Sequence, residues 1–127
     1  MNAKYAPMHK AFEFAFVMGQ PYNQSVNDKD LAKLRCDLIM EEVGEVFDEF
    51  NRPEIHPELL TKELVDLLYV VYGAAVAFGL PIDEVYDRVH ASNMSKLDDN
   101  GKPIFREDGK VLKGPNYKQA DLFDLFN

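Results

Sequence analysis

An acidic side chain stands in the middle of an apolar helical segment, and this placement limits how the chain can fold. Residues 63–72 read ELVDLLYVVY, so Asp66 is surrounded in the sequence by leucines and valines. A helix that is apolar on all sides belongs in a protein core, where an unpaired carboxylate is costly unless something neutralises it. The sequence therefore predicts that the fold supplies a partner that compensates the charge of Asp66.

Four helical segments are predicted, with turn-rich stretches between them. Asn27 or Asp28 is a suitable N-cap for the second helix, and Pro53 ends it. Pro57 stands in the first turn of the third helix, where a missing N–H is harmless. In chain order, the predicted helices cover about residues 6–18, 28–52, 57–78 and 82–97.

Residues 98–127 contain Asn-Gly, Asp-Gly and Gly-Pro turns around short apolar pieces, which predicts an irregular arm or a short hairpin. The length of 127 residues is enough for one core and too short for two. We therefore expect an all-α bundle of four to five helices in a single domain over residues 1–127. Its helical core covers about residues 6–97 and its C-terminal arm residues 98–127.

The net charge of −8 is concentrated in one part of the chain. Residues 28–66 hold twelve acidic and five basic side chains, which gives −7. Such an acidic chain is a poor candidate for binding nucleic acid through phosphate contacts. Metal cations are the expected partners of this acidic block.

The compartment is predicted from the absence of other signals. The first twelve residues lack the apolar run of a signal peptide, and the longest charge-free run, residues 67–82, contains two glycines and a proline. We expect a soluble, cytoplasmic protein with no membrane contact. Cys36 is the single cysteine, which excludes an internal disulfide, and a small buried side chain is expected there.

Acidic residues on two predicted helices form the candidate metal site. On the second helix, the row Leu31, Leu34 and Leu38 continues at helical spacing as Glu42, Glu45 and Glu49, so one stripe changes from apolar to acidic. On the third helix, two acids stand three residues apart, and the loop over residues 51–56 is short enough to make the two helices antiparallel neighbours. The carboxylates expected to converge are Glu42, Glu45, Glu63 and Asp66.

The residue types favour a hard cation. Oxygen ligands select Mg²⁺ first, with Mn²⁺ as the usual substitute, whereas zinc prefers histidine or cysteine. A di-iron bundle would need Glu-x-x-His, and no glutamate stands three residues before His9, His56 or His90. The competing interpretation is a solvated acidic helix face, which is common. Mg²⁺ held by protein carboxylates typically shares its ligands with substrate phosphates, so hydrolysis of a phosphate ester or phosphoanhydride is the expected chemistry.

Basic residues follow the acidic block. Seven of the fourteen lysines and arginines fall between residues 88 and 118, and Asn93 and Lys96 lie three residues apart near the end of the fourth helix. A single lysine is usually a solvated surface charge, so only the cluster points to phosphates. No P-loop is present, because Pro115 occupies the lysine position after Gly109 and Gly114. Aromatic residues of the segment AFEFAF, with Tyr69 and Tyr72, are expected to pack the core rather than stack on a base.

The sequence EEVGE at 41–45, followed after seventeen residues by ELVD at 63–66, resembles the EExxE…ExxD signature of the all-α nucleoside triphosphate pyrophosphohydrolases. That superfamily includes MazG, the dimeric dUTPases, the dCTP pyrophosphatases and phosphoribosyl-ATP pyrophosphohydrolase. The resemblance covers about residues 8–97, and NMSK at 93–96 is similar to the Asn and Lys that the family places after its metal helices. The arm is typical of small, single-domain and often phage-encoded members.

The resemblance implies a MazG-like bundle completed by association into homodimers or homotetramers. It also implies a Mg²⁺-dependent cleavage between the α- and β-phosphates of a (deoxy)nucleoside triphosphate, which yields a nucleoside monophosphate and pyrophosphate for nucleotide-pool control. Carried over by position, the metal ligands are Glu42, Glu45, Glu63 and Asp66, with Glu41 in support or orienting the water. The implied catalytic set is Glu41, Glu42 and Glu45, and the implied substrate-binding set is Asn93, Lys96, Lys110 and Lys113.

Two alternatives stay open on the sequence alone. One is hydrolysis of phosphoribosyl-ATP within the same superfamily. The other is a non-catalytic helical regulator that binds a divalent ion or a nucleotide. In each case a cation near Asp66 would let that carboxylate stay ionised among apolar neighbours.

Overall fold

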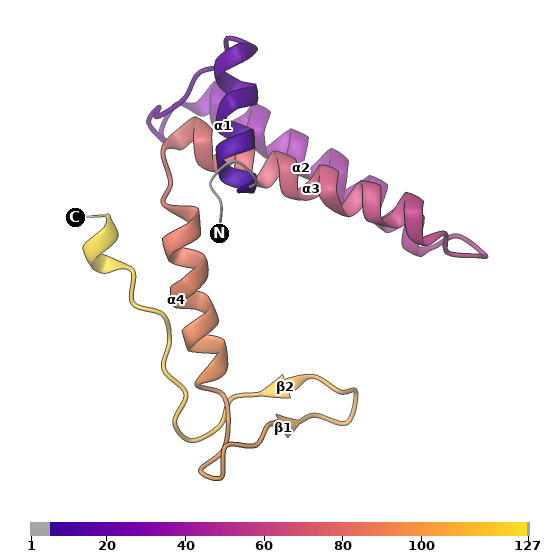
Figure 1. Cartoon of the computed structure of the whole chain (residues 1–127), viewed down its shortest axis with the longest axis vertical. Coiled ribbons are helices and arrows are strands. Elements are labelled where there is room, and N and C mark those ends of the chain that lie inside the picture. The colour runs from indigo at the N-terminus through magenta and orange to yellow at the C-terminus, as the bar shows by residue number, and fades with distance from the viewer. Residues whose placement is uncertain (1–5, 127) are drawn as a thin grey trace. The chain divides into compact units, whose positions relative to one another are not determined.

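The computed structural model describes residues 6–126, which divide into two compact units. The first unit ends at Leu80 and the second begins at Pro81, and each is described by itself. The first unit contains α1 (Pro7–Val17), α2 (Lys29–Phe50) and α3 (Pro57–Phe78) (Figure 1). The second contains α4 (Ile82–Met94), β1 (Ile104–Phe105), β2 (Val111–Leu112) and a short 3₁₀ turn, η2 (Phe123–Leu125).

In the first unit, α2 and α3 lie side by side and α1 packs across α3 (Figure 1). The side chain of Asp28 caps α2 by accepting a hydrogen bond from the Leu31 N–H at 3.1 Å. Pro57 occupies the first turn of α3, and Gly79 ends that helix in the left-handed region at φ 62°. The loop between α2 and α3 covers residues 51–56 alone, and the two helices run antiparallel (Figure 1).

Small residues let α1 approach α3 closely. Ala11 and Ala15 of α1 pack on Val76 of α3 at 3, 2 and 2% exposure, with Met8 and Tyr72 around them. After α1, the chain lies against the end of α3, because the N–H groups of residues 23 and 24 donate to the carbonyls of residues 76 and 77 at 3.1 and 2.8 Å. The core of this unit therefore lies where α1 meets the C-terminal half of α3.

In the second unit, the C-terminal segment is bound to α4. Arg88 of α4 donates to both carboxylate oxygens of Asp124 at 2.5 and 3.0 Å and to the Asp121 carbonyl at 3.0 Å. Strands β1 and β2 form an antiparallel hairpin in the register Ile104–Leu112 and Phe105–Val111. This hairpin lies in the arm for which the sequence predicts an irregular path or a short hairpin.

The all-α prediction is confirmed, and the structure corrects three details. Helix α4 ends at Met94 rather than near residue 97, because the Lys96 carbonyl accepts from the Gly114 N–H at 2.8 Å and so belongs to the arm. Cys36 is exposed rather than buried. The apolar residues beside Asp66 are not enclosed within one chain, since Val65 and Leu68 are 51% and 54% exposed.

The described helices were also compared with the length and hydropathy of a membrane span. Within residues 6–126, no single helix is long and apolar enough to cross a membrane, although α3 and α4 taken as one broken segment would be by length and composition alone.

Candidate metal centre and adjoining cavity

Helix α2 turns one side toward α3, and the residues on that side determine what the site contains. Buried or half-buried positions recur along α2 at steps of three and four residues, namely Leu31, Arg35, Leu38, Glu42, Val46 and Glu49. These steps follow the helical repeat, so the six side chains lie in one row. Within this row, Glu42 is the acid that lies halfway along the helix.

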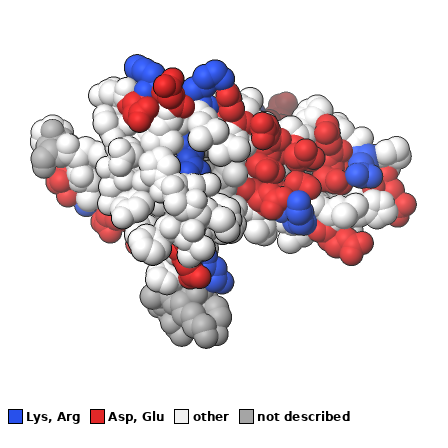
Figure 2. Space-filling view, turned by 90° about the horizontal axis from the view of Figure 1, so that it is seen from above, with Lys and Arg blue, Asp and Glu red and all other residues white. Residues whose placement is uncertain are grey.

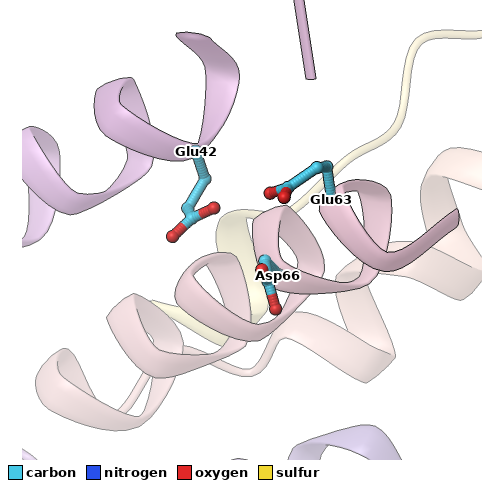
Figure 3. Close-up of side chains that lie close together, drawn as sticks. All are labelled: Glu42, Glu63 and Asp66. Atoms are coloured by element: carbon cyan, nitrogen blue, oxygen red, sulfur yellow. The ribbon is translucent and has the colours of Figure 1, made fainter. Parts of the chain in front are cut away.

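Helix α3 supplies two carboxylates opposite Glu42. Glu63 and Asp66 stand three residues apart, so they project from the same side of α3. Each of the three acids offers an oxygen atom, and these atoms all lie within 4.8 Å of one another. Figure 3 shows the Glu42 carboxylate extending from α2 toward the two carboxylates of α3. The packing of α2 on α3 thus brings together three like charges, all half-buried.

The local electrostatics are those of crowded carboxylates. Partial burial raises the pKa of Glu42, and the neighbouring charges of Asp66 and Glu63 raise it further. Lys62 opposes this effect, because its Nζ lies 2.5 Å from an Asp66 oxygen and 3.6 Å from a Glu63 oxygen. Lys62 is itself largely exposed, so its compensation is screened by solvent. The cluster therefore favours an additional cation.

The donor set fits a divalent hard ion. All three groups are carboxylate oxygens, which Mg²⁺ and Ca²⁺ prefer, and no thiol or imidazole belongs to the group. Ligand oxygens at about 2.1 Å from Mg²⁺ lie about 3 to 4 Å from one another. The three oxygen atoms lie within 4.8 Å of one another, so the side chains would move inward to hold one ion. More acids gather nearby, since Figure 2 shows Asp and Glu concentrated on the face over α2 and α3.

A cavity of about 350 Å³ adjoins the cluster within the first unit. Glu42 and Asp66 line it, together with the rings of Phe14 and Tyr69, which meet edge to face at 5.5 Å between centroids. Phe14 and Tyr69 are 40% and 41% exposed, so the prediction that they pack in the core is wrong for both rings. The acids therefore stand beside a partly aromatic hollow of the size that small ligands occupy.

Sequence comparison assigns the family. Residues 11–93 match the family model described as phosphoribosyl-ATP pyrophosphohydrolase. The chain belongs to the phosphoribosyl-ATP pyrophosphohydrolase family. The matched segment includes all three clustered carboxylates and extends from α1 into α4. The predicted membership of the all-α pyrophosphohydrolase superfamily is thereby confirmed.

A viral protein is also similar. The chain is 32% identical over 123 residues to an uncharacterized protein of Acanthamoeba polyphaga mimivirus. The alignment covers 88% of this chain and 44% of the viral protein, so the chain spans less than half the length of that relative. Because that relative is uncharacterized, the likeness does not assign an activity to this chain.

Two predicted acids of α2 lie outside the three-carboxylate group. Glu41 and Glu45 are exposed, and the half-buried position next to Glu45 is taken by Val46. The row predicted from the sequence continues from Glu42 to Glu45. In the structure, the row of buried and half-buried residues continues from Glu42 to Val46. The roles of Glu41 and Glu45 as water-orienting group and metal ligand stay predictions.

The predicted substrate-binding residues all belong to the second unit. Asn93 lies in the last turn of α4 and is exposed, and Lys96 follows the helix and is half-buried. Lys110 and Lys113 are exposed in the arm, where Lys113 lies 4.8 Å from the centre of the Tyr117 ring. Their roles toward a nucleotide stay predictions.

Three residues near the cluster were not predicted from the sequence. Lys62 had a detectable signal, because a lysine four residues before Asp66 can pair with it along a helix. Arg35 and Gln20 line the cavity but had no comparable signal in the sequence, because an arginine on a helix is usually a surface charge. Only the packing of α1, α2 and α3 reveals them.

Proposed function

We propose that this protein hydrolyses a (deoxy)nucleoside triphosphate between its α- and β-phosphates, releasing a nucleoside monophosphate and pyrophosphate. The observation that carries the proposal is the cluster of Glu42, Glu63 and Asp66 within 4.8 Å on two adjacent helices. Its occurrence in a chain of the phosphoribosyl-ATP pyrophosphohydrolase family supports this chemistry over a plain acidic surface. Control of the nucleotide pool is the expected biological use.

In this proposal Glu42, Glu63 and Asp66 hold Mg²⁺, with Mn²⁺ as a substitute, and Glu45 is a fourth ligand. The ion supplies positive charge for phosphate oxygens and lowers the pKa of a bound water. The raised pKa of Glu42 supports a cation site, because a nearby positive charge relieves the repulsion that raises it. Glu41, exposed on the same helix, is kept as the residue that supports the ligands or orients the attacking water.

The remaining predicted residues act on the substrate. Asn93 and Lys96 are proposed to contact the nucleotide and its phosphates, and Lys110 and Lys113 to neutralise the triphosphate. Each offers the N–H donors and, for the lysines, the positive charge that phosphate oxygens accept. We also propose that residues 1–127 form one domain with a core over about residues 6–97 and an arm over 98–127. Residues 1–5 and 127 of this proposed domain lie outside the described residues.

We propose further that the protein is a homodimer or homotetramer. One face of α2 carries an apolar stripe at steps of three and four residues: Met40, Val43, Phe47 and Phe50, which are 60, 40, 64 and 50% exposed. Large apolar side chains at helical spacing on an open face are typical of a surface that packs against another helix. A second copy of the chain offers the same stripe, as a two-fold symmetric interface requires.

A substrate panel tests the function. The protein is incubated with each common (d)NTP and Mg²⁺, and released pyrophosphate is measured; we expect release from at least one nucleotide and none when the metal is chelated. A parallel assay with phosphoribosyl-ATP tests the second candidate, which the family match favours. Thermal stabilisation by Mg²⁺ without turnover of any of these substrates would reject both and leave a non-catalytic binding protein.

A further inference from the structure

The wall of the cavity beside the carboxylate cluster contains a buried cation that the proposed hydrolysis does not use. Arg35 of α2 is 7% exposed and lines the same cavity as Glu42 and Asp66. Burial lowers its pKa, and no neighbouring carboxylate raises it. An arginine held away from both water and an acid is uncommon, because its charge and five N–H donors need partners.

The hydrogen bonding of Arg35 is incomplete. Its Nη2 donates to the Gln20 side-chain oxygen at 3.3 Å, whereas its Nε is buried with no partner among the described residues. Buried polar groups in proteins are nearly always paired, so a buried guanidinium on a cavity wall with one long hydrogen bond is a sign of a missing ligand. Such a ligand must bring an acceptor to the part of the cavity that Arg35 lines.

Helix α3 leaves room for this guanidinium. A Cβ atom added to Gly73 would lie 2.9 Å from Nη1 of Arg35, closer than real Cβ contacts allow. Gly73 is therefore the residue type that lets the arginine lie flat against α3 at the cavity wall. Arg35 and Gln20 both line the cavity, and the Gln20 side-chain oxygen already accepts from Arg35, which leaves the Gln20 amide nitrogen as a further donor.

We propose that this cavity holds the base of the nucleotide and that Arg35 and Gln20 bind a carbonyl-bearing edge of that base. The inference rests on the proposed function, which puts the phosphates at the cluster of Glu42, Glu63 and Asp66. The base then lies in the cavity beside the rings of Phe14 and Tyr69, with its carbonyl group toward the Arg35 side chain. Because Arg35 and Gln20 offer donors, the site favours a base with a carbonyl group, such as uracil, thymine or guanine, and disfavours adenine, which has no carbonyl group and carries an amino group.

Kinetics with four nucleotides test the preference. We measure kcat/KM for dUTP, dTTP, dGTP and dATP with Mg²⁺ in the unaltered protein and in Arg35→Gln. In the unaltered protein, kcat/KM for a preferred carbonyl-bearing substrate should exceed kcat/KM for dATP by at least about tenfold. Arg35→Gln should lower kcat/KM for that substrate by about 10- to 100-fold and change kcat/KM for dATP by less than about threefold. The control Lys29→Gln, which removes an exposed cation from the same helix, should change neither.

A second variant guards against misfolding of Arg35→Gln. Gly73→Ala keeps the charge of Arg35 but fills the space beside its Nη1, and alanine is a better helix former than glycine. It should reduce the preference for the carbonyl-bearing base in a protein that melts no lower than the parent. An unchanged preference in Gly73→Ala together with an unchanged preference in folded Arg35→Gln would overturn the proposal.

Binding without turnover separates this inference from the proposed function. Calorimetry with dUMP, dTMP, dGMP and dAMP in the presence of Mg²⁺ should show tighter binding of a carbonyl-bearing nucleotide, reduced in Arg35→Gln. Selective binding with no pyrophosphate release would reject the hydrolysis and keep the base site. Turnover with equal kcat/KM for all four triphosphates would reject the base site and keep the hydrolysis. The same conclusion would follow if Arg35→Gln weakened the binding of inorganic pyrophosphate as much as that of nucleotide.

Discussion

At the scale of single residues, Asp66 is explained by its neighbours rather than by deep burial. Its side chain is 34% exposed, it pairs with Lys62, and it faces Glu42 across the gap between two helices. The charge that the sequence places inside an apolar segment therefore lies at the edge of a cavity, where solvent and a lysine share its compensation. The same position makes it available to a metal ion.

Replacing Asp66 by Asn should remove activity without unfolding the protein. Asn has nearly the same shape but no negative charge, so the cluster loses a ligand, and pyrophosphate release should fall at least about 100-fold. The matched control is Glu58→Gln, an exposed acid in the first turn of the same helix, which should keep full activity. Normal turnover in a folded Asp66→Asn protein would show that the cluster does not bind the metal used in hydrolysis.

The raised pKa of Glu42 makes stability depend on pH. Its pKa lies above the ordinary value near 4.5 in the folded protein, so the folded chain binds this proton more tightly than the unfolded chain. The resulting stability is present below pH 4.5 and is lost as the pH rises through the raised pKa. In chelator, the thermal midpoint of Glu42→Gln should therefore exceed that of the parent at pH 7 but not at pH 4.

The expected difference in stability between Glu42→Gln and the parent at pH 7 comes from partly exposed charges. Interactions between such charges typically contribute about 0.2–1 kcal/mol to the free energy of unfolding. Other groups titrate in the opposite sense, since the pKa values of Asp108 and Asp124 are lowered by their arginine partners. These effects are common to both proteins, so only the difference between parent and Glu42→Gln reports on Glu42. A difference that stays constant from pH 4 to pH 7 would contradict the raised pKa.

At the scale of elements, the register of α2 decides which acids take part. Its row of buried and half-buried residues passes through Arg35, Glu42 and Val46, and Glu45 is exposed beside that row. A row drawn through Leu34 and Glu45 is equally consistent with helical spacing, because positions three and four residues apart both lie near one face. Contact with α3 selects between the two rows.

The start of α2 depends on its cap. Asp28 accepts a hydrogen bond from the Leu31 N–H, so Asp28→Ala should lower the free energy of unfolding by about 1 kcal/mol. Asp28→Asn should keep most of the stability that the cap contributes, because its side-chain oxygen can still accept this bond. Urea denaturation followed by circular dichroism measures both. Equal losses in the two variants would mean that the negative charge near the helix start, rather than the hydrogen bond, is responsible.

At the scale of the whole molecule, a single chain does not enclose its large apolar residues. Within residues 6–126 no large side chain is fully buried, and the most buried apolar residues are mainly alanines. The stripe of α2 from Met40 to Phe50 is open in the isolated chain. Association of copies is the physical solution that the proposed homodimer or homotetramer provides.

Phe47→Glu should disrupt this association. A charge in the middle of an apolar interface is left without a partner, so light scattering should show a smaller species than for the parent protein. Phe47→Leu keeps the site apolar and should retain the parent assembly. If both variants and the parent have the mass of one chain, the proposed oligomer is wrong.

The sequence by itself determined the helices, the family and the acid pairs. Prolines and caps delimit helices within a few residues, and the spacing of EEVGE and ELVD places carboxylates on two neighbouring helices. These features are local, because they depend on bonds and side chains within one or two turns. The all-α fold and the superfamily follow from them, and both are confirmed. The cytoplasmic location, which has no such local basis, stays a prediction.

Tertiary structure alone decided which side chains meet. Three features depend on how α1 and α2 rotate and pack on α3. Glu42 meets Glu63 and Asp66, Glu45 lies outside that group, and Arg35 lies beside Gly73. A rotation of one residue along a helix turns a side chain by about 100°. Spacing in the sequence cannot fix that rotation, because neighbouring rows satisfy the same pattern and only close packing against another helix separates them.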